Sequence, residues 1–101
     1  MAILNGKRYR WYTDPATLHQ RRKWPYLDEV DGYPAGFIDS DEPYDVSTAK
    51  RHDLKLRVMV YDYSQLPRRT RKATREFKDL ASAKKELERL VLAYTNYAYK
   101  G

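Results

Sequence analysis

The stretch Leu54-Lys-Leu-Arg-Val-Met-Val-Tyr-Asp-Tyr63 decides the fold, because its apolar and polar side chains alternate at the period of a β-strand. The apolar side chains share one face, which we expect to be the core face: Leu54, Leu56, Val58 and Val60. The other face mixes cations with aromatic and sulfur side chains: Lys55, Arg57, Met59, Tyr61 and Tyr63. The alternation predicts a half-buried strand from Leu54 to Tyr63.

A basic turn and a second strand are expected after this strand. Pro67 fixes its own φ and disfavours helical backbone at Leu66, so the segment from Ser64 to Thr70 is predicted to turn. A strand from about Arg71 to Lys78 then closes an antiparallel hairpin.

A long amphipathic helix is predicted from Leu80 to about Ala98. Asp79 is a suitable N-cap, because its carboxylate can accept hydrogen bonds from the first-turn amides. Apolar residues recur along one side at spacings of three and four: Leu80, Ala83, Leu87, Leu90, Val91, Tyr94 and Tyr97. This side is expected to pack on the sheet.

The N-terminal segment predicts a further strand from Arg8 to Tyr12, where cations and aromatic rings alternate. Tyr9 and Trp11 share one face of it. Rings between cations can stack on bases, but for Trp11 we favour simple packing on the sheet. Asp14-Pro15 ends the strand, and a short helix over 16–23 is expected to finish in the cluster Arg21-Arg22-Lys23.

An acidic segment separates the two strand regions. Between Leu27 and Ser47 there is no Lys or Arg, and the acidic residues are Asp28, Glu29, Asp31, Asp39, Asp41, Glu42 and Asp45. Gly and Pro interrupt it, so we expect a long loop over 27–49 with at most a short strand at Gly36 to Ile38. Asp39, Asp41 and Asp45 offer oxygen ligands for a cation, although their spacing is not that of an EF-hand.

These segments predict a single α+β domain over residues 1–101: a small three-stranded antiparallel sheet packed on one long C-terminal helix, with a long acidic loop inserted after the first strand. Residues 1–26 hold the N-terminal strand and a basic segment, 27–49 the loop, and 50–101 the ββα core. No cysteine is present, and the two histidines are 33 residues apart. We therefore expect no thiolate metal site, no thiol nucleophile and no cofactor.

The chain has no apolar stretch of membrane-spanning length and no signal-peptide pattern after Met1. We expect a soluble protein of the cytoplasm, or of the host cytoplasm if it is phage-encoded, that does not bind membranes.

The net charge of +6 is unevenly distributed. From Lys50 onward, fourteen Lys and Arg against six Asp and Glu give +8, whereas residues 1–49 carry six against eight, or −2. A cationic core of this kind is typical of nucleic-acid binding, in which counterion release supplies affinity. The predicted contacts are Arg57, Tyr61, Arg68, Arg69, Arg71, Lys72 and Arg75, with DNA favoured over RNA as the partner; the alternative is a well-solvated surface.

Residues 54–92 resemble the arm-type, AP2-like DNA-binding module of phage tyrosine recombinases. The resemblance rests on the strand Leu54 to Tyr63, the basic turn, and Arg75-Glu-Phe-Lys-Asp-Leu-Ala-Ser-Ala-Lys leading into a helix. It implies a three-stranded sheet whose face enters the major groove, with Arg57, Tyr61, Arg71 and Arg75 as contacts. The chain carries about fifty further N-terminal residues and no recombinase catalytic domain. The resemblance therefore implies a free-standing binding module.

Two alternatives stay open. Asp62, a 13-residue gap and Glu76-Phe77-Lys78 are similar to the PD-(D/E)xK pattern of Mg²⁺-dependent nucleases, although Tyr61 replaces the usual Pro. The other alternative is a virus-encoded inhibitor or structural protein, which would bind a host or virion protein through its Tyr-rich surfaces and acidic loop. We expect a non-enzymatic protein whose main partner is nucleic acid.

Overall fold

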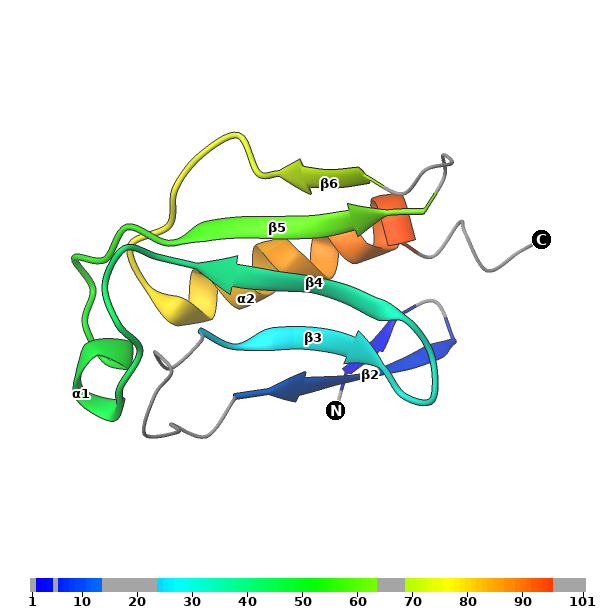
Figure 1. Cartoon of the computed structure of the whole chain (residues 1–101), viewed down its shortest axis with the longest axis horizontal. Coiled ribbons are helices and arrows are strands. Elements are labelled where there is room, and N and C mark those ends of the chain that lie inside the picture. The colour runs from blue at the N-terminus through cyan, green and yellow to red at the C-terminus, as the bar shows by residue number, and fades with distance from the viewer. Residues whose placement is uncertain (1, 5, 14–23, 64–68, 96–101) are drawn as a thin grey trace.

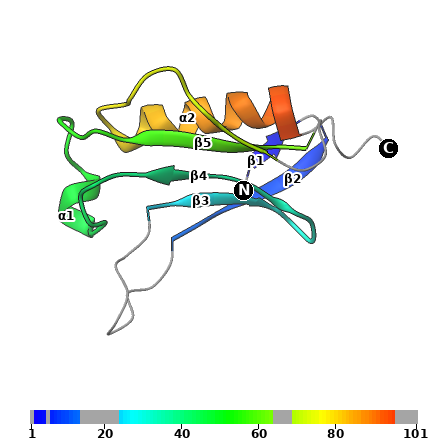
Figure 2. The ribbon, with the colours of Figure 1, turned by 45° about the horizontal axis from the view of Figure 1, so that its top comes forward.

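The computed structural model describes residues 2–4, 6–13, 24–63 and 69–95, which form one antiparallel sheet with a helix on one of its faces (Figure 1). Six strands lie in chain order across the sheet: β1 (Ala2–Leu4), β2 (Lys7–Tyr12), β3 (Tyr26–Glu29), β4 (Pro34–Asp39), β5 (Arg57–Asp62) and β6 (Arg69–Lys72). The helices are α1 (Val46–Ala49), α2 (Leu80–Leu90) and a π-helical turn, η1 (Val91–Thr95). Figure 2 shows α2 lying along one side of the sheet, behind β5.

The prediction of a three-stranded sheet is wrong, although the α+β class holds. Strand β4 and all but the first residue of β3 lie in the segment expected to be a long acidic loop, 27–49. The predicted strand at Gly36 to Ile38 lies within β4. Leu27 and Ile38 are buried, while Asp28 and Asp39 are only partly buried. Acidic side chains at alternate positions are therefore compatible with strands whose other face is core.

Gly36 in β4 has a packing role, although glycine in this segment was interpreted as a sign of a loop. A Cβ at Gly36 would lie 2.4 Å from the Met59 carbonyl oxygen and 2.6 Å from Leu87 Cδ1. The absence of a side chain lets α2 approach the sheet closely here. The residue that suggested a loop is thus a helix-packing site within a strand.

A further unpredicted strand, β1, pairs with β2 through a tight turn. Ala2 lies opposite Tyr9 and Leu4 opposite Lys7, and Gly6 in the turn has a φ of 81°. Glycine readily adopts a positive φ, which explains why a glycine occupies this position of the turn. The predicted strand from Arg8 to Tyr12 is confirmed within β2.

The core predicted from the first strand is confirmed. Its members have relative exposures of 2% or less: Leu54, Leu56, Val58 and Val60. From α2, Ala83 and Leu87 pack against them with no exposed surface. These residues form the layer that joins helix and sheet.

The helix begins where predicted. Asp79 is its N-cap, and a carboxylate oxygen of Asp79 accepts a hydrogen bond of 2.9 Å from the Ser82 backbone N–H. After Leu90 the chain continues through the π-helical turn to Thr95, and the rest of the helix predicted to reach about Ala98 lies outside the described residues.

Strand β6 is shorter than the predicted strand from Arg71 to Lys78. It begins two residues earlier and ends at Lys72, after which one isolated bridge joins Phe77 to Leu56. The short helix predicted over 16–23 lies outside the described residues, as does most of the predicted turn around Pro67. No helix in the described part of the chain is long and apolar enough to cross a membrane.

Candidate functional site

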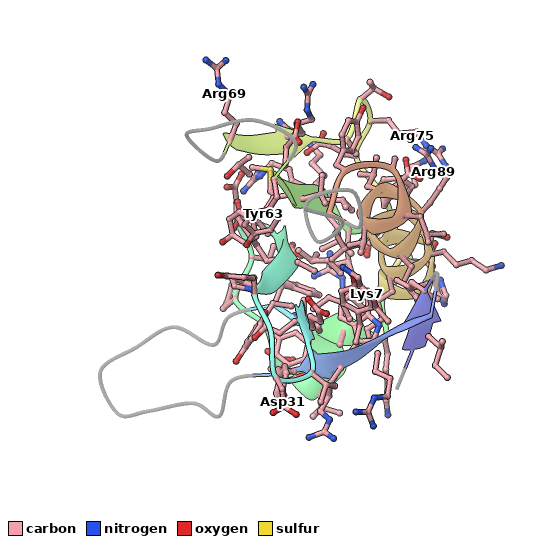
Figure 3. All side chains as sticks on the ribbon, turned by 90° about the vertical axis from the view of Figure 1, so that its right-hand side faces the viewer. Lys7, Asp31, Tyr63, Arg69, Arg75 and Arg89 are labelled. Atoms are coloured by element: carbon pink, nitrogen blue, oxygen red, sulfur yellow. The ribbon has the colours of Figure 1, made fainter. Side chains whose placement is uncertain are left out.

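The face of the sheet opposite α2 carries a row of aromatic rings. In Figure 3, α2 lies on one side of the strands, Tyr63 lies on the other, and none of the described helices covers that second face. We call the exposed side the open face. Its rings form the aromatic row: Tyr12, Tyr26, Phe37, Tyr61, Tyr63 and Tyr33.

The strand register builds the first half of the row. Tyr12 on β2 lies directly opposite Tyr26 on β3, which in turn lies opposite Phe37 on β4. The Tyr12 and Tyr26 rings stack with centroids 5.5 Å apart and an interplanar angle of 20°. Phe37 then contacts Tyr61 on β5 at 5.8 Å. Such cross-strand aromatic pairs stabilise a sheet face.

The second half of the row is held by rings and by one backbone contact. Tyr61 lies 6.5 Å from Tyr63, and Tyr63 lies 5.8 Å from Tyr33 in the β3–β4 connection. The Tyr63 hydroxyl donates a hydrogen bond of 2.7 Å to the Pro34 carbonyl oxygen. These contacts restrict the rings before any ligand binds, which lowers the entropy cost of using them as contact surface.

An arginine between two carboxylates marks one end of the open face. Arg57 Nη2 donates to Asp39 at 2.8 Å and to Asp41 at 3.0 Å. The hydrogen bond from Arg57 holds the pKa of Asp41 below its usual value, and the same contacts raise the pKa of Arg57. The Arg57 charge is therefore balanced within the protein.

Other cations border the row on both sides. On β2, Arg8 and Arg10 alternate with the buried Tyr9 and are exposed. On β6, Lys72 is exposed and lies opposite Met59, which shares the open face with Tyr61. The row thus lies between positive groups on its two flanking strands.

The predicted nucleic-acid contacts do not form one surface. Arg57 and Tyr61 lie on the open face, and so does Lys72 by its register opposite Met59. Arg71 lies opposite Val60, a core residue, and is therefore on the helix side. The remaining predicted contacts are Arg69, exposed at the start of β6, Arg75, and Arg68, which lies outside the described residues.

Arg71 and Arg75 have contacts on the helix side. Arg71 Nε donates to the carboxylate of Asp62, which has no exposed surface, and its guanidinium lies 4.8 Å from the Tyr94 ring centroid. The bond to Asp62 raises the pKa of Arg71. The Arg75 guanidinium lies 4.6 Å from the Phe77 ring centroid, and Figure 3 shows Arg75 beside the helix, near Arg89.

The residues of the nuclease pattern are not brought together. Asp62 ends β5 and pairs with Arg71, whereas Glu76 and Lys78 flank Phe77, which bridges to Leu56 at the other end of that strand. Six residues of strand separate these ends by about 20 Å. A shared Mg²⁺ between Asp62 and Glu76 is incompatible with this separation.

The three aspartates considered as cation ligands also have separate roles. Asp39 and Asp41 bind Arg57, and Asp45 caps α1 by accepting a hydrogen bond of 2.7 Å from the Thr48 backbone N–H. Among the described residues, no group of three or more His, Cys, Asp or Glu side chains is placed to hold a metal ion.

The first predicted aromatic pair belongs to the core. Tyr9 has no exposed surface, and its burial, together with the nearby Glu29, raises its pKa to about 12. Trp11 packs against the core, as favoured for it, with Lys84 Nζ 5.0 Å from its ring centroid. Neither ring is available on the open face.

Sequence reasoning missed Tyr26, Phe37 and Tyr33 as surface residues, because β3 and β4 were not predicted as paired strands. The available signal was the opposite parity of Tyr12 to Tyr9 and Trp11, which places Tyr12 on the outer face. No protein-family model matches the chain, and comparisons with curated proteins and with solved structures also give no match.

Proposed function

We propose that this chain is a small, non-catalytic nucleic-acid-binding protein and that the open face is its binding surface. The observation that carries the proposal is the aromatic row, a fixed set of rings across four strands with exposed cations on both flanking strands. Aromatic rings offer stacking surface to bases, and flanking Lys and Arg supply contacts to phosphate.

The charge of the whole chain supports the same partner. A net charge of +6 attracts a polyanion over a distance of about one Debye length, roughly 8 Å at physiological salt. Of the residues first predicted as contacts, Tyr61 and Lys72 stay in the proposal. Arg57 borders the open face, with its guanidinium paired to Asp39 and Asp41. Arg71 and Arg75 leave it, because their described contacts are with the protein's own helix side.

The test compares two lysines that differ in position but not in charge. Lys72 is exposed on the open-face side of β6, and Lys85 is exposed on α2. Lys72→Ala is expected to weaken binding to a labelled oligonucleotide and to lower the salt slope by about 0.7 to 0.9, the value for one phosphate contact. Lys85→Ala is expected to leave both unchanged.

Equal effects of the two substitutions would refute the open face as the binding surface. An absence of nucleic-acid binding at low salt would refute the proposed function. The tyrosine-rich face would then point to a protein partner, since tyrosines concentrate binding energy at protein interfaces.

A further inference from the structure

The open face suits one class of nucleic acid more than another. Resting on the proposed function, we infer that its ligand is single-stranded nucleic acid, whose bases stack on the aromatic row. Single-stranded DNA and RNA share the exposed base faces that this requires. Three observations support the inference: the width of the open face, the spacing of its rings, and the ion pairs that Arg57 makes with Asp39 and Asp41.

The open face is too broad to enter a duplex groove. Neighbouring strands lie about 4.8 Å apart, so the four strands that carry the row span about 14 Å and all six about 24 Å. The major groove of B-DNA is about 12 Å wide and admits a helix or a two-stranded ribbon. The whole row therefore cannot reach base edges inside a groove.

The ring spacing suits bases that are separated from one another. Four ring pairs along the row, Tyr12–Tyr26, Phe37–Tyr61, Tyr61–Tyr63 and Tyr63–Tyr33, have centroid distances of 5.5, 5.8, 6.5 and 5.8 Å. A duplex keeps its bases stacked about 3.4 Å apart and hidden from a flat protein surface. A single strand can spread its bases and place successive ones on successive rings.

The arginine of this face favours stacking over reading of base edges. Arg57 donates to Asp39 and Asp41, so a bidentate contact to guanine would first have to break those two ion pairs. Ring stacking works with every base. The expected ligand is therefore bound with little dependence on sequence.

The cations give the strand a path across the sheet. On β2, Arg10 lies two residues before Tyr12 on the same face, opposite Asp28 on β3. On β6, Lys72 lies opposite Met59, which in turn lies opposite Phe37 of the row. A strand that crosses from β2 to β6 passes over the row and meets positive charge at both ends. The Asp39–Arg57–Asp41 group lies to one side of this path, at the end of the face formed by the start of β5.

Tyr61 is the ring to substitute, because it contacts both Phe37 and Tyr63 in the row. Binding is measured with oligonucleotides of about 12 units: oligo(dT), oligo(U), a duplex containing the same dT strand, and an abasic strand with the same phosphates. The chains compared are the unchanged protein, Tyr61→Ala, Tyr61→Phe and Lys85→Ala, each checked for folding by its melting curve.

Tighter binding of oligo(dT) or oligo(U) than of the duplex and the abasic strand, by at least tenfold, is the expected result. Tyr61→Ala should weaken that binding by roughly tenfold, as for the loss of one stacked base, whereas Tyr61→Phe and Lys85→Ala should change it less than about twofold.

Equal binding of duplex or abasic strand would overturn the inference of stacked single strands while leaving the proposed nucleic-acid binding intact. Binding to none of the four would overturn both. If Tyr61→Ala fails to fold, Tyr12→Ala replaces it, because Tyr12 is 36% exposed and lies at the end of the row.

Discussion

Arg71 donates a hydrogen bond from its Nε to the carboxylate of Asp62, a residue with no exposed surface. The side chain of Arg71 is 45% exposed, so this ion pair connects the surface of the edge strand to the interior. Arg71 lies in a basic segment that was predicted to contact phosphate. Its partner in the structure is Asp62 on the neighbouring strand of the same sheet.

Removing this arginine is expected to destabilise the fold. Arg71→Ala leaves the buried Asp62 without its guanidinium, a costly change, and should lower the melting temperature by roughly 10 °C. The matched control is Lys72→Ala, since Lys72 is the next residue on the same strand, is exposed and lies on the other face of the sheet, opposite Met59. Equal melting temperatures for the two variants would contradict the structural role of Arg71.

Gly36 is expected to tolerate no side chain. Gly36→Ala places a Cβ against the fixed Met59 carbonyl oxygen and against Leu87, so we expect a loss of about 2 kcal/mol in the free energy of unfolding. Gly32→Ala is the control, because the atoms nearest to a Cβ there belong to the flexible side chain of Glu29 and not to the backbone. Urea unfolding measures both, and a Gly36→Ala protein as stable as the unchanged chain would contradict the close helix–sheet contact.

The two aspartates beside Arg57 are expected to restrain nucleic-acid binding. Asp41→Asn removes one negative charge from the border of the open face and leaves only a neutral amide oxygen to accept from the Arg57 guanidinium, which weakens that contact. Affinity for a single-stranded oligonucleotide should rise about two- to fivefold at low salt, with a smaller rise at high salt. Glu88→Gln on α2 makes the same change in net charge; an equal gain there would show a general charge effect instead.

The N-cap of α2 makes one contribution to stability pH-dependent. The hydrogen bond from the Ser82 backbone N–H lowers the pKa of Asp79 from its usual 3.8. A folded-state pKa below the unfolded value stabilises the fold above about pH 3.8, and this stabilisation is lost as the pH falls through the folded pKa. Asp79→Asn keeps a capping oxygen without the titration.

The melting temperature of the unchanged protein should therefore exceed that of Asp79→Asn at neutral pH. The gap between the two proteins should close as the pH falls below 3.8. A gap that stays constant from pH 7 to pH 2 would show that the Asp79 charge does not stabilise the helix.

Strong periodicity made part of the fold predictable from sequence. The alternation from Leu54 to Val60 identified β5 and its core face, and the spacing of Ala83, Leu87 and Leu90 identified the face of α2 that packs on it. The cap at Asp79 followed from residue chemistry alone. Each of these features is local, so no knowledge of the rest of the chain was needed.

Strands β3 and β4 were not predictable in the same way. Tyr26–Glu29 is only four residues long, and β4 begins with Pro34 and contains Gly36, both of which suggest a loop. Their pairing is fixed by contacts with β2, β5 and α2. Without these strands, Tyr12 and Tyr61 could not be placed on one continuous surface.

The assignment of Arg71 depended on the parity of one strand. A signal was present, because Ala73 and Phe77 share the parity of Arg71 and are buried. That parity places Arg71 on the helix side and Lys72 on the open face. Arg75 lies beyond the end of β6, so its place beside Phe77 could not be read from the same alternation. Charge density alone carries no information about which face of a sheet a cation occupies.

The most direct test of the central claim is an NMR titration of the ¹⁵N-labelled protein with single-stranded oligo(dT). Binding at the open face predicts that the largest amide and aromatic shifts occur at Tyr12, Tyr26, Phe37 and Tyr61, with little change along the exposed side of α2. Largest shifts on α2, or no shifts at low salt, would contradict the account.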